Sequence, residues 1–141
     1  MGIISRSVVT VSRTATVFDA VELMASAEIG SVVVVDGGQV VGIFSERDVM
    51  FRVVLEDRNP KNTTVEEVMT AQMHTVSLRT TGDAALKIMI QEHIRHLPVV
   101  DEQGRPQAIV SMRSLLEEQV KDLNQQLDSL ESYVTADDIG G

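Results

Sequence analysis

The chain has 141 residues and a formal net charge of −9, and it is 43% hydrophobic but only 3% aromatic, with no cysteine. The missing cysteine excludes a disulfide framework, a thiol nucleophile and a cysteine zinc site, while the acidic balance argues against a nucleic-acid partner. The apolar content, with 22 valines, favours a packed core with buried strands; we expect a cytoplasmic protein because no membrane span or signal peptide is evident.

The sequence repeats itself once. Ten identities align at an offset of 65 residues, among them Thr10–Ser12 with Thr75–Ser77, and four more align at an offset of 66, including Ser45 with Ser111. Since one copy of about 50 residues would bury little core alone, we expect the two copies to pack against each other.

The first copy begins with a short strand and a helix whose apolar residues recur at helical spacing. Thr16 and Asp19 form a capping pair at the helix start. A hairpin with an Asp-Gly-Gly turn follows, and then a second helix. The expected elements are a strand at Val8–Val11, strands at Val32–Val35 and Val40–Phe44, and a helix beginning at Ser45.

A polar linker, Glu56–Thr64, separates the copies, and Thr64 with Glu67 predicts the cap of a short helical turn. The second copy repeats the same order, with Thr80 and Asp83 as its capping pair. Its expected strands are His74–Ser77, Leu97–Val100 and Gln107–Val110, and its second helix begins at Ser111.

The C-terminal region has a different pattern. Apolar residues separated by 4, 3, 4, 3 and 4 positions form a heptad seam at Leu116, Val120, Leu123, Leu127, Leu130 and Val134. Either this helix packs on its own domain, or it protrudes to pair with another subunit. Because so short a coiled coil is marginal alone, we favour a dimer contact supported by the globular body.

These patterns predict an α/β fold, with two β-α-β-β-α repeats packed as a pseudo-two-fold pair and an extended C-terminal helix. The expected segments are repeat 1 at 7–57, a linker and short helix at 58–72, repeat 2 at 73–120, the heptad helix at 116–134 and a disordered tail at 135–141. Residues 115–141 carry a net charge of −6, so the acidity belongs mainly to the tail.

The most informative motif lies where the last strand of repeat 1 meets the following helix. There Gly42 permits a close backbone approach, and Ser45 precedes Asp48 by three residues. The carboxylate could accept two hydroxyl hydrogen bonds from a sugar, and Arg47 could approach a phosphate. The same spacing also describes a simple capping box, and on spacing alone that interpretation is favoured.

The duplicated unit, with Gly-hydrophobic-x-Ser-x-x-Asp at its last junction, resembles the cystathionine-β-synthase (CBS) domain, and the tandem pair resembles a Bateman module. Val68-Met69-Thr70 and the segment from Ile94 to Asp101 also match, so the resemblance covers about residues 7 to 120. It implies a regulatory module that binds AMP, ADP or ATP between the repeats, with S-adenosylmethionine or NAD as second choices, and that needs no cofactor.

Within that resemblance, Ser45 and Asp48 are the ribose and phosphate candidates, and Ile43 lies beside the base. The first strand contributes Thr10 and Val11. The basic candidates are Arg47, Arg95 and His96, with Ser111 and Arg113 as possible phosphate contacts of the second junction.

The second junction departs from the motif, because Ala108 replaces the glycine and Ser114 replaces the aspartate. A serine lacks the two strong acceptors of a carboxylate, so we expect one competent and one degraded site. His93 and His96 stand three apart without a third ligand, and we predict no metal site. No catalytic constellation is evident.

We therefore expect a non-enzymatic nucleotide sensor that forms a homodimer through its CBS helices and C-terminal helix, and that regulates an unknown protein in trans. The alternative is a ligand-free interaction or scaffold module, in which Ser45 and Asp48 only cap a helix.

Overall fold

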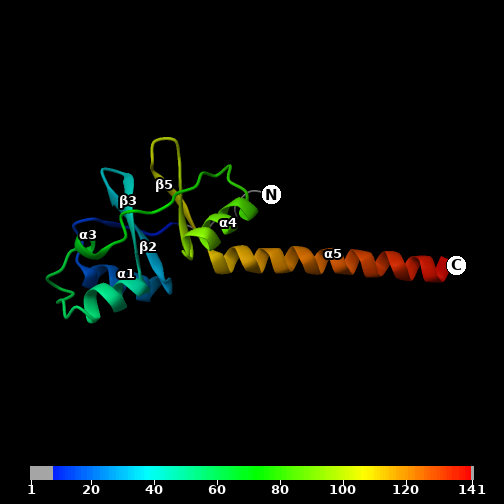
Figure 1. Cartoon of the computed structure of the whole chain (residues 1–141), viewed down its shortest axis with the longest axis horizontal. Coiled ribbons are helices and arrows are strands. Elements are labelled where there is room, and N and C mark those ends of the chain that lie inside the picture. The colour runs from blue at the N-terminus through cyan, green and yellow to red at the C-terminus, as the bar shows by residue number, and fades with distance from the viewer. Residues whose placement is uncertain (1–7, 141) are drawn as a thin grey trace.

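The computed structural model describes residues 8–140, and the surroundings of side chains through residue 132. Two strand-containing units form a globular body, and one long helix projects from it (Figure 1). The expected start of repeat 1 at residue 7, the side chain of Val134 and the terminal residue 141 lie outside the described part. The architecture is therefore the α/β pair with an extended C-terminal helix that the sequence predicts.

The first unit has a three-stranded sheet in the order β1-β2-β3, with β1 parallel and β3 antiparallel to the central β2. Its elements are β1 (Thr10–Ser12), α1 (Val17–Ala27), β2 (Ser31–Asp36), β3 (Gln39–Ser45), α2 (Glu46–Asp48) and the π-helix η1 (Val49–Val54). The helix expected after Ser45 is thus present, but most of it is a π-helix, for which the sequence gives no signal.

The second unit has a two-stranded antiparallel sheet of β4 and β5. Its elements, with the short helix that precedes it, are α3 (Val65–Val68), α4 (Gly82–Glu92), β4 (His96–Val100), β5 (Pro106–Ser111) and α5 (Met112–Gly140). The strand expected at His74–Ser77 is wrong as a strand: this segment makes a single parallel bridge, from Val76 to Val99.

The two units use the same local structures at equivalent positions. Val11 pairs with Val34 in the first unit, and Val76 pairs with Val99 in the second, each 65 residues later. Both first helices end in a left-handed residue, Glu28 at φ 54° and the equivalent His93 at φ 55°. The internal repeat predicted from the sequence is therefore a structural repeat.

Threonine hydroxyls cap both of these helices. Thr16 Oγ1 accepts a hydrogen bond from the Asp19 N–H at 3.1 Å, as predicted. In the second unit Thr81 takes this role, accepting from the Ala84 N–H at 3.2 Å. The predicted cap Thr80 was wrong, because its hydroxyl accepts from the Ser77 N–H in the preceding turn.

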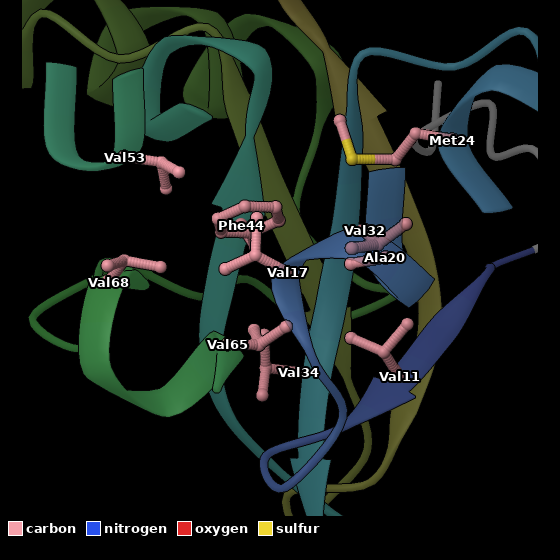
Figure 2. Close-up of a cluster of buried hydrophobic side chains, with 10 residues drawn as sticks. All are labelled: Val11, Val17, Ala20, Met24, Val32, Val34, Phe44, Val53, Val65 and Val68. Carbon is pink, nitrogen blue, oxygen red and sulfur yellow. The ribbon is translucent and has the colours of Figure 1, made fainter. Parts of the chain in front are cut away.

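Each unit has its own valine-rich core. In the first, Phe44 of β3 is fully buried among residues from α1, β2, η1 and α3 (Figure 2). In the second, Leu97 and Met89 lie among smaller aliphatic side chains, and Leu115 joins them from the start of α5. The core of the first unit thus fixes the end of β3, where the candidate motif begins.

The linker between the units packs against the first unit. The carbonyl oxygens of Pro60 and Thr63 accept from the free N–H groups of Phe18 and Val17 at the start of α1, at 3.0 and 2.9 Å. The Thr63 side chain is buried and donates to the Asn59 carbonyl at 2.8 Å. The backbone carbonyls of the linker thus satisfy two N–H groups at the start of α1.

The C-terminal helix is longer than predicted. It runs from Met112, next to the helix start expected at Ser111, to Gly140, and so joins that helix and the heptad helix expected at 116–134 in one element. The disordered tail expected at 135–141 stays a prediction. Its first turns pack on the second unit, where Gln119 Nε2 donates to Asp83 Oδ1 at 3.0 Å. Within the described residues, no helix is long and apolar enough to cross a membrane.

Candidate functional site

The candidate motif lies at the junction of β3 and α2, and it forms a complete capping box. The Ser45 N–H and hydroxyl both donate to Asp48 Oδ2, at 3.0 and 3.2 Å, and the Asp48 N–H donates back to Ser45 Oγ at 3.4 Å. Asp48 is only 6% exposed, which is unusual for a carboxylate. Ser45 and Asp48 therefore cap the helix, and the cap holds a buried, oriented carboxylate at this junction.

The other carboxylate oxygen of Asp48 faces the segment that leads into the second unit. Thr70 Oγ1 donates to Asp48 Oδ1 at 3.3 Å, and Arg52 Nε lies 3.8 Å from the same oxygen. Arg52 also donates to the Met69 carbonyl at 2.8 Å, close to the end of α3. The carboxylate is thus held against the segment that connects the two units, by Thr70 and Arg52, neither of which belongs to the motif of Ser45 and Asp48.

Gly42 allows this segment to pass close to β3. A Cβ atom at Gly42 would lie 2.5 Å from Met69 Sδ, so the flexible Met69 side chain would have to move, and 3.0 Å from the Thr70 carbonyl oxygen, a tight contact with backbone. Next to it, Ile43 and Thr70 exchange two backbone hydrogen bonds, at 3.0 and 2.9 Å. Glycine at this position therefore allows the close approach of the two chain segments, whatever else the junction does.

The sheet register decides which candidates share a face with Ile43. Thr10, Val33 and Ile43 are neighbours in register across β1, β2 and β3, so their side chains project to one side. Val11 projects to the other side and belongs to the core. The structure thus brings Thr10 and Ile43 to one face, while the buried side chain of Val11 is directed away from it.

The two junctions are built alike. The Glu46 N–H, directly after Ser45, donates to the Gly30 carbonyl at 3.0 Å; the equivalent Met112 N–H donates to the Arg95 carbonyl at 2.8 Å. This bond ties the start of the second helix to the residue before β2 in the first unit and to the residue before β4 in the second. The Arg95 side chain is exposed.

His96 lies between the units. Burial lowers the pKa of its imidazole below the usual 6.5; the nearby carboxylate of Glu46 raises this pKa and Arg95 lowers it further. His96 is also the strand neighbour of Ser111 across β4 and β5. The β3–α2 junction of the first unit therefore lies near His96 and Ser111 of the second unit.

The lowered pKa of His96 predicts an acid sensitivity. At a pH between the lowered pKa of the folded chain and about 6.5, His96 is mostly protonated in the unfolded chain but mostly neutral in the folded chain. Protonation therefore favours the unfolded chain, and the free energy of unfolding falls as the pH decreases below about 6.5. Urea unfolding between about pH 7.5 and pH 5.5 should show this loss, and His96→Gln should show a smaller one. The control Gln125→Ala, at an exposed position of α5, removes no titratable group and should keep the slope of the native chain. An unchanged slope in His96→Gln would contradict the assignment.

The second junction lacks a carboxylate and is closed by its own hydroxyls. Ser111 Oγ accepts from the Ser114 N–H at 3.0 Å, and Ser114 Oγ donates to the Ser111 carbonyl at 2.9 Å. Arg113 is 89% exposed and pairs with Glu117 at 3.0 Å. Its expected phosphate contact stays a prediction. Arg47 also points outward, with its guanidinium 5.1 Å from the centre of the exposed Phe51 ring.

The family model for the CBS domain matches this chain twice, over residues 2–55 and 65–121. The chain belongs to the CBS-domain family. The match covers both repeats and confirms the resemblance seen in the sequence. Among the described residues no group of three or more His, Asp or Glu side chains is placed to hold a metal ion.

Several CBS proteins are similar to this chain. A solved CBS-domain protein from Burkholderia ambifaria is 38% identical, with a TM-score of 0.77 over 84% of this chain and 86% of that one. An uncharacterized protein from Methanopyrus kandleri is 34% identical over 79% of this chain. A CBS protein from Pyrobaculum aerophilum, 23% identical, shares the fold with a TM-score of 0.72 over 84% of this chain and 95% of that one. The chain spans 58% and 60% of the length of the first two curated relatives that it matches.

Proposed function

We propose that this CBS pair is a non-enzymatic sensor that binds one adenosine nucleotide, AMP, ADP or ATP, at the junction of β3 and α2. The observation that carries the proposal is the buried, oriented carboxylate of Asp48, which lies beside the segment that connects the two units. The module would act on a regulated protein in trans.

Ligands of structural neighbours support the adenosine class. The Pyrobaculum aerophilum protein was solved in complex with AMP. Another CBS domain pair, 23% identical with a TM-score of 0.78, was solved with 5′-methylthioadenosine and S-adenosylmethionine. Adenosine is the chemical group that these ligands share, so ribose and adenine are the parts that we expect this chain to recognise.

The geometry at Asp48 suits a ribose. Its Oδ1 accepts from Thr70 at 3.3 Å, which is longer than the 2.5–3.0 Å that is usual for hydroxyl donors. A ribose hydroxyl at hydrogen-bond distance would make a stronger bond to this charged acceptor and would take the place of Thr70. The Ser45 bonds to Oδ2 keep the carboxylate oriented while this exchange occurs.

The same exchange provides a mechanism for signalling. Thr70 belongs to the segment that connects the units, and releasing it from Asp48 loosens one tie between that segment and the first unit. Glu46 and His96 lie at the same boundary, and the hairpins meet where the Val40 N–H donates to the Gly104 carbonyl at 2.9 Å. Nucleotide would favour the arrangement of the units in which its contacts are best.

We propose one nucleotide per chain. At the second junction Ser114 stands where the first has Asp48, and its hydroxyl is already bonded to its own helix start. A neutral hydroxyl cannot offer the charged acceptor that Asp48 Oδ1 would present to a ribose hydroxyl. Ser111 remains a candidate phosphate contact through its position beside His96.

A second function is supported by two observations. The capping box satisfies Asp48 without any ligand, and the apolar seam of α5 is exposed. Both fit an interaction or scaffold module that binds no nucleotide.

A thermal unfolding screen with AMP, ADP, ATP, NAD and S-adenosylmethionine separates the two functions. A ligand present at about 100 times its dissociation constant adds about 2.7 kcal/mol to the free energy of unfolding. For a chain of this size that corresponds to a rise in melting temperature on the order of 8 °C. No rise with any of these ligands would contradict the sensor and favour the scaffold.

A further inference from the structure

The helix α5 carries a stripe of apolar side chains that the globular body leaves uncovered. Each side chain of the stripe retains 45–59% of its accessible surface, and together they occupy every position of the predicted seam that the structure describes. The members are Leu116, Val120, Leu123, Leu127 and Leu130. So many large exposed aliphatic residues in one line are unusual for a surface and indicate a contact.

The body of the same chain does not provide that contact. Leu115 turns into the core of the second unit, and Gln119 reaches Asp83, so the first turns of α5 are anchored. Beyond this point the helix projects away from both units as a straight rod (Figure 1). In proteins most of the stability of a helix comes from packing of its apolar face, so the part of α5 that lies beyond the body needs a partner.

The spacing of the stripe specifies another helix as the partner. Alternating intervals of 4 and 3 residues average 3.5, the period of a left-handed coiled coil. In heptad terms Val120 and Leu127 occupy a positions, and Leu116, Leu123 and Leu130 occupy d positions. A β-branched residue at a with leucine at d favours a two-stranded parallel pair, though Leu127 at the other a position does not add to this preference.

The polar residues beside the stripe favour the same orientation. In a parallel pair, Gln119 of one helix would face Asn124 of the other, and Gln126 would face Glu131, so no two acids meet. In a fully overlapped antiparallel pair, Glu117 would face Glu131 of the other helix, twice. These two pairs of facing glutamates repel each other, so the antiparallel arrangement is disfavoured.

We propose that α5 is a dimerisation arm that pairs with α5 of a second copy of this chain, parallel and in register. Two globular bodies are then held at the same end of a short coiled coil. This contact is independent of nucleotide binding, because no residue of the stripe belongs to the β3–α2 junction.

Sedimentation equilibrium over a dilution series tests the pairing in the full chain. We expect a mass that approaches twice the 15.4 kDa chain mass at high concentration. The double variant Leu123→Glu with Leu130→Glu should associate more weakly, with its dimer mass reached only at higher concentration. The matched control Gln125→Glu with Ser132→Glu adds the same charge on the opposite side of the helix and should dimerise like the native chain. A monomeric native chain, or a seam variant that associates as tightly as the control, would overturn the proposal.

Single cysteines test the orientation, because the chain has none of its own. In a parallel pair in register, a residue at d meets its own counterpart, so Leu116→Cys and Leu130→Cys should each form a disulfide-linked dimer on mild oxidation. Gln125→Cys, on the outer side, should form far less. An antiparallel pair brings distant ends together instead; absence of crosslinks at both Leu116→Cys and Leu130→Cys would therefore overturn the parallel register.

Discussion

Replacing Phe44 with alanine should lower the free energy of unfolding by about 3–5 kcal/mol, the usual cost of removing a fully buried aromatic ring. Phe44 is completely buried in the first core, against residues from α1, η1 and α3 (Figure 2). It is also the residue before Ser45, so the cavity would form directly beneath the candidate site. Urea unfolding followed by circular dichroism measures the loss.

Phe51→Ala is the matched control. It removes the same ring from η1, where 49% of the side chain is exposed and the ring contacts Arg47. We expect this variant to lose less than about 1 kcal/mol, in line with other substitutions at exposed positions. If both variants lost the same free energy, the ring of Phe44 could not be the centre of the first core.

Replacing Asp48 with asparagine should abolish most of the stabilisation that an adenosine nucleotide gives the native chain. Hydrogen bonds to a charged group are worth about 1.5–3 kcal/mol, so affinity should fall roughly ten- to hundredfold. Asparagine keeps the size of the side chain and one acceptor oxygen, and the fold should survive. The measurement is the ligand-induced rise in melting temperature at one fixed nucleotide concentration.

The control for this variant is Thr81→Ala. It removes the hydroxyl that caps α4 in the second unit, which should cost about 1 kcal/mol without touching the β3–α2 junction. Its nucleotide-induced rise in melting temperature should equal that of the native chain. An equal rise in Asp48→Asn would show that the carboxylate does not bind the ligand.

Local patterns in the sequence located most of the secondary structure. Thr16 is recognisable as a cap because its hydroxyl and the N–H three residues later lie in one turn, and the 65-residue offset aligns Thr81 with it. The spacing to Asp83 favours Thr80 instead. Adjacent threonines both suit a cap, and only the backbone conformation decides between them.

Contacts between distant segments were not predictable in the same way. Thr70 reaches Asp48 because its strand-like segment pairs with Ile43, a bond between residues far apart in the sequence. The match of Val68-Met69-Thr70 to the family was the available signal, although it did not name a partner for Asp48. Arg113 likewise pairs with Glu117 one turn further along α5, a partner that the junction motif does not indicate.

Isothermal titration calorimetry of the full chain with AMP, ADP and ATP tests the central claim most directly, because it gives affinity and stoichiometry together. The account predicts that at least one of them binds at one molecule per chain, and that Asp48→Asn weakens this binding while Thr81→Ala leaves it unchanged. Binding of two molecules per chain with equal affinity would contradict the difference between the junctions. Absence of binding by all three nucleotides would contradict the sensor itself.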